Sequence, residues 1–300
     1  MASRPDWTAL FPYEPKTMAL GGLRYAYVDE GQGETLLAVH GNPTWSFYWR
    51  NLIRDLAPRY RVVAVDHVGC GRSDKPDDYP YRLEQHVDNL ARLVEQLDLR
   101  NVTLLAHDWG GPIGLGAALA HQDRFARFVV FNSAAFRSRR MPWRIRVCRT
   151  PILGRIAVQG FNGFARAALR MATACPQRFT PEVRAGMLAP YDTWSHRRAI
   201  YEFVADIPMS PAHPSYQTLT DIETRLSQLA DRPWMFVWGM RDWCFTPEFL
   251  DRFLEFVPDA EVHRIADAGH YVVEDAHEQI VPLLRAFAEK HPLGAASHRA

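Results

Sequence analysis

The feature of the sequence that most constrains its fold is a series of short apolar runs rich in β-branched residues. These runs lie at residues 23–29, 35–40, 61–66, 102–107, 128–133, 234–239 and 261–265. Several are apolar throughout, which is typical of strands covered on both faces of a parallel sheet. Segments of helical length alternate with them at 45–57, 84–98, 110–121, 246–256 and 277–290. The alternation predicts a doubly wound, mostly parallel α/β sheet with helices on both faces.

This alternation is interrupted between residues 137 and 228, where the patterns are helical and punctuated by proline and glycine. A helical block between two core strands is typical of an inserted cap. We therefore predict a core formed by residues 1–136 and 229–300, and a helical cap formed by residues 137–228. Ligands of such sheets bind at the carboxyl ends of the strands and between domains, so functional residues are expected there.

Composition excludes several classes of protein. With 47% hydrophobic and 23% charged residues the chain is not disordered, and a formal net charge of +1 argues against a general nucleic-acid binder. No run reaches the ~18 apolar residues of a membrane-spanning helix. The N-terminal residues lack a signal-peptide pattern, and the four cysteines form no CxxC pair, so we expect a cytoplasmic protein with reduced thiols. Without an HExxH motif or a Cys/His cluster, we expect neither a metal nor a cofactor.

The segment AHDWG at 106–110 follows an apolar run and opens a helical segment, the context of a hydrolase nucleophile elbow. Ala106 replaces the usual first glycine, and Asp108 stands where serine is usual. An aspartate before a helix is more often only an N-cap, but the remaining candidates below favour a nucleophile. A carboxylate with an ordinary pKa of ~3.9 is already ionised at neutral pH. Asp108 is therefore suited to displace a leaving group from an sp3 carbon, which forms an alkyl ester.

Water that opens such an ester needs a base, and His270 is the candidate. It follows the last apolar run, 261–265. Asp242 follows the run 234–239 and would fix the tautomer of His270 and stabilise its imidazolium form. Taken alone, an aspartate in a loop is more often a turn residue and a lone histidine is more often structural. The chain order nucleophile, acid, histidine favours the catalytic interpretation.

Asn42 and Trp109 are the candidate oxyanion-hole residues. Asn42 lies in the segment HGNP that follows the run 35–40, and Trp109 follows the predicted nucleophile. In a hydrolase of this kind, these two positions supply the backbone N–H groups of the oxyanion hole. Both side chains also carry N–H donors, and two neutral donors in an apolar pocket suit a compact monovalent anion. Taken alone, Asn-Pro is typical of a turn.

Between about residues 22 and 290 the sequence resembles the haloalkane dehalogenases of the α/β-hydrolase superfamily. The motifs that carry the resemblance are HGNPTWSFYWRNLI (40–53), DHVGCGRSDKP (66–76), AHDWGG (106–111), WGMRDWCF (238–245) and DAGHYVVED (267–275). It implies an eight-stranded, mostly parallel sheet with a helical cap, and the reaction of haloalkane and water to alcohol and halide. Asn42 and Trp109 match the halide-binding pair of that family. One subfamily carries a catalytic Glu after the sixth strand, where this chain has Asn132, so the acid is expected at Asp242.

The cap suggests an alternative within the same superfamily. Its segments are similar to those of the β-lactone decarboxylases of bacterial long-chain olefin biosynthesis; they are MPW (141–143), GFNGF (160–164), APYDTW (189–194) and DIPMSP (206–211). In both reactions Asp108 would attack an sp3 carbon. The leaving group is halide in one and the lactone's own carboxylate in the other.

Other activities fit the residues less well. An epoxide hydrolase would need acidic cap tyrosines, for which Tyr191, Tyr201 and Tyr216 are candidates. Asn42 argues against it, because that family usually has an aromatic residue there. Asp108 at the nucleophile position disfavours a serine esterase. The complete set of catalytic candidates disfavours a non-catalytic receptor on the same scaffold.

The segment 137–155 is strongly basic. It holds seven arginines interleaved with apolar residues, and no Asp or Glu occurs from Arg124 to Pro181. The simpler interpretation is a solvated face, because arginine supplies almost all the positive charge of this chain. The alternative hypothesis is that segment 137–155 docks the cap on an anionic membrane surface or on partner enzymes of the pathway that the resemblance implies.

Overall fold

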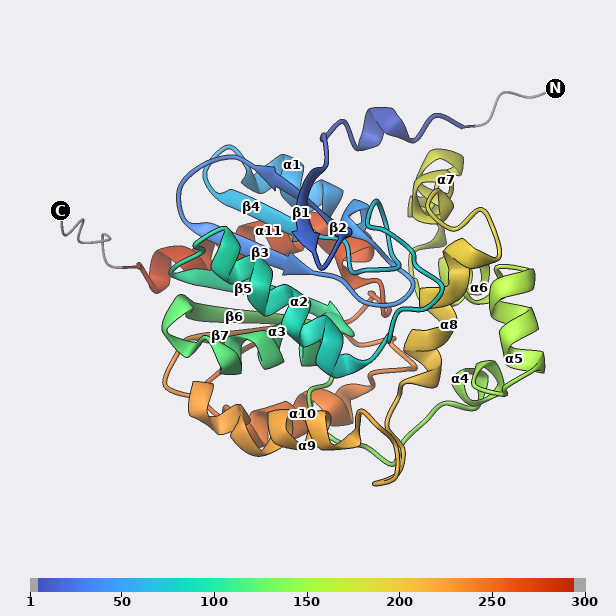
Figure 1. The fold of residues 1–300 in the computed structure, drawn as a ribbon. Helices are drawn as coiled ribbons and strands as arrows, with labels where there is room; N and C mark the ends of the chain where they lie inside the picture. Colours follow the sequence, from blue (N-terminus) through green and yellow to red (C-terminus); the bar gives the residue numbers. More distant parts are fainter. Residues whose placement is uncertain (1–4, 294–300) are drawn as a thin grey trace.

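The apolar runs form one eight-stranded sheet in the computed structural model, which describes residues 5–293 (Figure 1). The strands lie in the order β1-β2-β4-β3-β5-β6-β7-β8. Their bounds are β1 (Lys16–Leu20), β2 (Leu23–Glu30), β3 (Thr35–Val39), β4 (Arg61–Val65), β5 (Val102–Asp108), β6 (Phe125–Ser133), β7 (Trp234–Gly239) and β8 (Glu261–Ile265). β2 pairs antiparallel with β1 and β4, and the other pairs are parallel. The expected eight-stranded, mostly parallel α/β fold is therefore confirmed.

Helices cover both faces of this sheet and bury a separate apolar cluster on each. Figure 1 shows α2 (Leu83–Gln96) and α3 (Gly110–Ala120) in front of the strands, with α1 (Arg50–Leu56) and α11 (Val272–Lys290) behind them. The lower edge carries α10 (Pro247–Phe256), which packs on β7. Every residue of β3 and β7 is buried, which explains why their sequences do not alternate.

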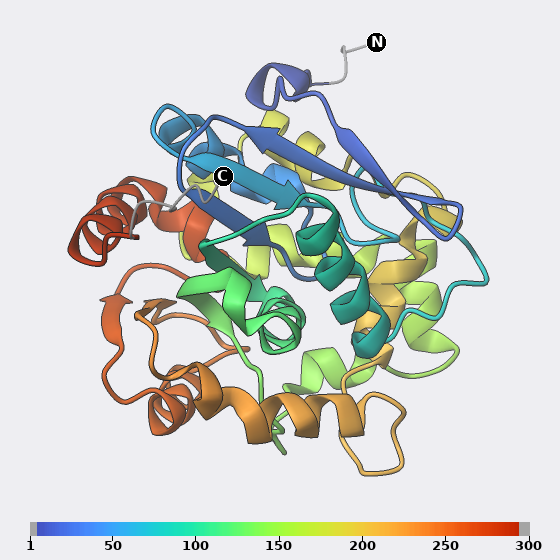
Figure 2. The same ribbon diagram turned by 60° about the vertical axis from the view of Figure 1, so that its left-hand side comes forward.

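Between β6 and β7 the chain forms helices and no strand within the described residues. These are α4 (Trp143–Cys148), α5 (Leu153–Arg155), a π-helical turn η4 (Ile156–Gly160), α6 (Gly163–Met171), α7 (Pro181–Leu188), α8 (Arg198–Ala205) and α9 (Tyr216–Arg225). Figures 1 and 2 show α4 to α8 gathered beside the sheet. By contrast, α9 packs against α2 and α3. The predicted cap, 137–228, thus includes one helix that covers the core, and its boundaries stay a prediction.

Two buried carboxylates fasten the cap to the core. Asp206 follows α8 and accepts hydrogen bonds from the backbone N–H of Leu83 at 2.9 Å and from Nη1 of Arg82 at 2.8 Å. Asp275 accepts from the N–H groups of Ala174 and Gly269, both at 2.8 Å. Because Gly269 precedes the predicted catalytic histidine, the second contact couples the cap to the loop that carries it. No helix among residues 5–293 has both the length and the apolar character needed to cross a bilayer.

A buried ion pair anchors the start of α11. Arg50 and Glu274 are 5% and 3% exposed, and their two N···O distances are 2.6 and 2.8 Å. The guanidinium also lies 4.4 Å from the ring centroid of Phe47. Bidentate pairs of this kind fix geometry as well as charge. This pair therefore holds the start of α11, two residues after His270, in place.

We expect Glu274→Ala to lower the free energy of unfolding by about 3–5 kcal/mol, because it leaves the Arg50 charge buried without a partner. Glu289→Ala is the matched control on the same helix, since Glu289 pairs with Arg59 at the exposed surface. That change should cost less than about 1 kcal/mol. Urea unfolding of both variants measures the difference. Equal losses would contradict the anchoring role.

Candidate active site

Asp108 occupies a strained turn between β5 and α3. Its φ is 52°, in the left-handed region that non-glycine residues rarely adopt. The turn is tight on both sides: a Cβ on Gly110 would lie 2.0 Å from the carbonyl oxygen of Val39. A Cβ on Gly41 would lie 2.2 Å from Oδ1 of Asp108 itself. The small neighbours therefore let the backbone close around a carboxylate that points into a cavity.

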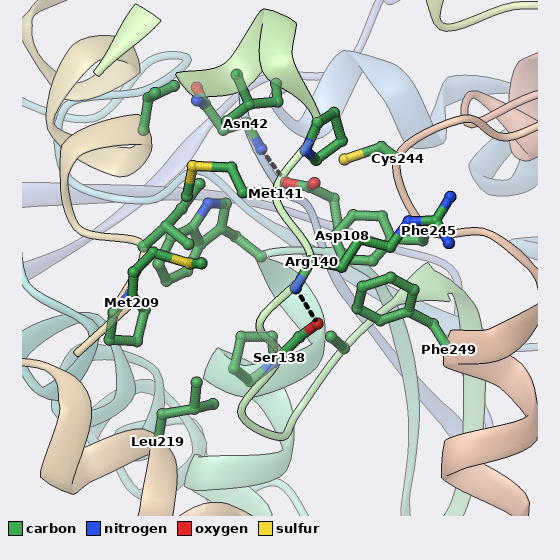
Figure 3. Close-up of a pocket in the computed structure, with 18 of the residues that line it drawn as sticks. Asn42, Asp108, Ser138, Arg140, Met141, Met209, Leu219, Cys244, Phe245 and Phe249 are labelled. Carbon is green, nitrogen blue, oxygen red and sulfur yellow. Dashed lines mark hydrogen bonds between the residues drawn. The ribbon is translucent and has the colours of Figure 1, made fainter. Parts of the chain in front are cut away.

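The Asp108 carboxylate is buried but well supplied with hydrogen-bond donors. The backbone N–H of Asn42 donates to its Oδ1 at 2.7 Å (Figure 3). Burial raises the pKa of Asp108 above its ordinary value, although the charge of His270 and the backbone N–H groups of Asn42 and Trp109 oppose the rise. An ordinary pKa for Asp108 is expected from the sequence alone, and the structure corrects this: the pKa of Asp108 is raised.

The three residues predicted as a triad meet in space. Nδ1 of His270 lies 2.8 Å from Oδ2 of Asp242, and Nε2 lies 3.6 Å from Oδ2 of Asp108. Burial lowers the pKa of His270, but the negative charges of Asp242 and Asp108 outweigh burial and hold it above the ordinary value of 6.5. The histidine thus lies between two carboxylates that both favour its imidazolium form.

Asn132 supports this arrangement in a way that the sequence did not reveal. Its Nδ2 donates to Oδ2 of Asp242 at 3.0 Å, and its Oδ1 accepts from the N–H of Gly239 at 2.7 Å. The other oxygen of Asp242 accepts from the N–H of Cys244 at 2.6 Å. Asn132 is therefore a positioning residue for the acid. The feature of the sequence that could have indicated this role is the position of Asn132 in the run 128–133, where one subfamily carries its catalytic Glu.

His107 is a second supporting residue that the sequence analysis missed. It is fully buried, its Nε2 donates to the carbonyl oxygen of His270 at 2.8 Å, and the two rings are 4.6 Å apart. Burial and the neighbouring charge of His270 hold the pKa of His107 well below its ordinary value. A neutral His107 can thus fix the backbone of His270 without adding charge. Its signal in the sequence is its place beside the predicted nucleophile.

The side chain of Asn42 differs from expectation. Its Nδ2 donates to the carbonyl oxygen of Ile200 in α8 at 3.0 Å, so one of its donors holds the cap. Its Oδ1 is buried without a partner among the described residues. Trp109 lines the cavity beside Asp108, as expected. The pair therefore lies at the site, but the expectation that both side chains offer free donors to a ligand is only partly met.

Two apolar chambers meet at Asp108, and Asn42 and Cys244 also line both. The first chamber runs between core helices and the cap and is lined by Leu83, Phe136, Met141, Met209, Leu219, Phe245 and Phe249 among others (Figure 3). The second chamber extends under α4, η4 and α6 and is lined by Trp143, Val147, Val158, Ala168, Met171 and Tyr271 among others. The two chambers also share Ile145 of α4 and Phe164 of α6. Beyond the shared residues, the first chamber is lined from α2, α8, α9 and α10, and the second from α4, η4 and α6, so the chambers extend from Asp108 toward different elements.

The tyrosines that an epoxide hydrolase would need do not line these chambers, as far as the described residues show. Tyr191 is buried and its hydroxyl donates to the carbonyl oxygen of Thr44 at 3.1 Å. The ring of Tyr216 lies beneath the guanidinium of Arg137. Tyr201 packs in the cap and lies beneath Arg155. Their positions disfavour an acid role toward a ligand at Asp108.

Comparison with known proteins agrees with this architecture. Residues 34–276 match the α/β hydrolase fold family. The chain belongs to this family. A cis-3-alkyl-4-alkyloxetan-2-one decarboxylase of Xanthomonas campestris is 41% identical to this α/β hydrolase over 297 residues, covering 94% of this chain and 98% of the relative. Haloalkane dehalogenase 2 of Mycobacterium tuberculosis is 30% identical over 274 residues, covering 90% and 93%.

A solved structure gives the same result for the fold. The haloalkane dehalogenase DatA of Agrobacterium tumefaciens superposes on this α/β hydrolase with a TM-score of 0.85 at 27% identity, covering 94% of this chain and 99% of the other. The resemblance that the motifs implied is thus confirmed. This α/β hydrolase is an enzyme of the type that haloalkane dehalogenases and β-lactone decarboxylases share.

The pKa of His270 can be measured directly. We expect NMR titration of its ring to give a value above 6.5, because Asp242 and Asp108 favour the charged imidazolium. In Asp242→Asn the nearer negative charge is absent and burial dominates, so the pKa should fall below that of the wild type. A wild-type value at or below 6.5, or a variant value that does not move, would contradict the charge balance described here.

Proposed function

We propose that this enzyme is a β-lactone decarboxylase that converts a lactone with two alkyl chains into an alkene and CO2. The observation that carries the proposal is the pair of apolar chambers that meet at Asp108. The substrate in the decarboxylase relative's name carries alkyl groups on two adjacent ring carbons. One chamber for each chain would place the ring carbon that bears the leaving oxygen at the carboxylate.

The reaction balances with the residues at the site. Asp108 attacks C4 of the lactone, the C4–O bond breaks, and the ring opens to a C3 carboxylate on an alkyl-enzyme ester. The C3–carboxylate bond then breaks with release of CO2. Its electron pair forms the C3=C4 double bond and expels Asp108 from C4. Neither water nor an added base is consumed, and Asp108 returns as a carboxylate.

The environment of His270 supports this route. Asp242, 2.8 Å from Nδ1, favours the imidazolium form of His270 also when Asp108 is an uncharged ester, and Nε2 of His270 lies 3.6 Å from Oδ2 of Asp108. A cation there stabilises the Asp108 carboxylate as it leaves C4 in the second step. Hydrolysis of an alkyl-enzyme ester would instead require the neutral imidazole as base.

Haloalkane hydrolysis is the second candidate, and Trp109 is the observation that favours it. Trp109 and Asn42 both line the first chamber together with Asp108, as a halide-binding pair would. Asp108 would displace halide, and water activated by His270 would then release the alcohol. A simple haloalkane has one alkyl chain, so it would leave one chamber without a role.

We also place the enzyme in the cytoplasm. All four cysteines are free thiols, and Cys70 is buried in the core. Free thiols in a chain with no disulfide among its described residues fit a reducing compartment.

A side-by-side assay separates the two reactions. We expect the wild type to convert a synthetic cis-3,4-dialkyl β-lactone to alkene and CO2, measured by gas chromatography, and Asp108→Ala to be inactive. With 1-bromobutane, His270→Ala should accumulate an alkyl ester on Asp108 if the enzyme hydrolyses haloalkanes, because only ester opening needs the base. Intact-protein mass spectrometry detects that adduct. Formation of a β-hydroxy acid from the lactone, or decarboxylation by the Asp108→Ala variant, would contradict the decarboxylase proposal.

Blocking one chamber at a time tests how the substrate binds. Met209→Trp narrows the first chamber, and Ala168→Trp narrows the second. Each should lower kcat/KM at least about tenfold for a lactone with two long chains, since lost apolar contacts of even one methylene matter in such pockets. Each variant should recover kcat/KM on a lactone whose alkyl chain is shortened on one of the two ring carbons. The two variants should prefer lactones that are shortened on different ring carbons. If both variants prefer the same shortened lactone, the two-chamber assignment is wrong.

A further inference from the structure

Large apolar side chains are exposed on the cap and almost nowhere else among the described residues. Nine such side chains are exposed, and eight of them lie in the cap. We call these eight the cap patch: Trp143, Val147, Ile152, Leu153, Ile156, Phe161, Met171 and Trp194. Leu153 and Phe161 are each 74% exposed, and Ile152 is 72% exposed. Single exposed apolar residues are ordinary, but a contiguous group marks an interaction site.

The patch is contiguous in space. α4 contacts α5, α5 contacts η4, and η4 contacts α6, so the elements that carry most of the patch form one surface. Ile156 and the ring of Trp194 both approach Gly160, which joins Trp194 to this group. Figure 1 shows α4, α5 and α6 together at the outer edge of the molecule, away from the sheet.

The charge around the cap patch is positive and is not neutralised. The exposed arginines that accompany it and have no acidic partner among the described residues are Arg139, Arg144, Arg146, Arg166 and Arg170. No Asp or Glu occurs from Arg124 to Pro181. Asp192, two residues before Trp194, accepts a hydrogen bond from Nδ1 of His196 at 2.6 Å. The patch therefore combines apolar side chains with uncompensated guanidinium groups.

The cap patch also borders the second chamber. Trp143, Val147 and Met171 belong to the patch and line that chamber as well, together with Asp108 and His270. Arg144 lies between two indole rings at this point, 5.2 Å from each of Trp143 and Trp243. An apolar path thus leads from the exposed patch to the predicted nucleophile.

We propose that the cap patch docks this enzyme on the surface of an anionic lipid bilayer. Short helices with Trp, Phe and aliphatic side chains beside arginines suit the boundary between headgroups and acyl chains, where each class of side chain has a partner. An acidic protein would satisfy the arginines but would need a matching apolar face as well. A bilayer offers anionic headgroups for the arginines and acyl chains for the apolar side chains over the whole width of the patch. Docking depends on the surface of the cap alone; only the passage of substrate from the bilayer to the second chamber rests on the proposed function.

Co-sedimentation with vesicles tests the docking. The wild type should bind vesicles that contain phosphatidylglycerol and bind phosphatidylcholine vesicles weakly. Raising the salt from 0.1 M to 1 M should weaken binding, since the Debye length shrinks from about 10 Å to about 3 Å. The triple variant Ile152→Ser, Leu153→Ser, Phe161→Ser and the charge-reversed variant Arg146→Glu, Arg166→Glu should each bind at least about tenfold more weakly. None of these five residues lines either chamber.

Matched controls keep the result specific. Leu10→Ser removes the exposed apolar side chain outside the cap, and Arg92→Glu, Arg264→Glu reverses two exposed charges on α2 and β8. Both controls should bind vesicles as the wild type does. No binding by the wild type, or equal losses in the controls and the patch variants, would overturn the proposal. A different outcome is that sedimentation velocity shows self-association through the patch while the protein binds no vesicles. That result would overturn the proposal and would identify a second copy of the chain as the partner of the patch. Decarboxylase activity is measured separately, so either proposal can fail alone.

Discussion

A carboxylate buried in an apolar cavity stays charged only when donors and a cation surround it, and the rest of this site is arranged to meet that requirement. The backbone N–H of Asn42 and the imidazole of His270 both face Asp108. Gly41 leaves the space that the carboxylate fills, because a Cβ there would lie 2.2 Å from Oδ1. Asp242 and Asn132 act one step further out, since they fix the ring that balances the Asp108 charge.

The cap takes part in this arrangement through polar contacts. The side chain of Asn42 donates to the carbonyl oxygen of Ile200 in α8. The cap therefore holds the loop whose backbone N–H donates to Asp108. Asp275 binds the N–H of Ala174 in the cap and the N–H of Gly269 beside His270. Movement of the cap would therefore disturb both the donor and the histidine. The chambers and the charge balance at Asp108 therefore depend on the same contacts between cap and core.

Much of the fold and the site was predictable because local patterns encode it. The buried strands, the elbow at Asp108 and the chain order of Asp242 and His270 all follow from short motifs. The sequence did not reveal β1, whose three exposed positions give no apolar run. It also placed the start of α11 five residues late, because the helix bends at Ala276, where φ is −143°. The roles of Asn132 and His107 depend on contacts between distant segments, which no local pattern encodes.

The same distinction explains why motifs alone leave two reactions open. Displacement at an sp3 carbon by Asp108 is common to both, so the residues that perform it cannot tell them apart. The reactions diverge at the alkyl-enzyme ester, which is opened either by water and a neutral histidine or by loss of CO2 from the neighbouring carbon. The two reactions make different demands on the site: ester hydrolysis needs a neutral His270, and decarboxylation of a lactone with two alkyl chains needs room for both chains. Both conditions depend on packing: two carboxylates raise the pKa of His270, and two chambers that share residues of α4 and α6 open at Asp108 and extend toward different elements.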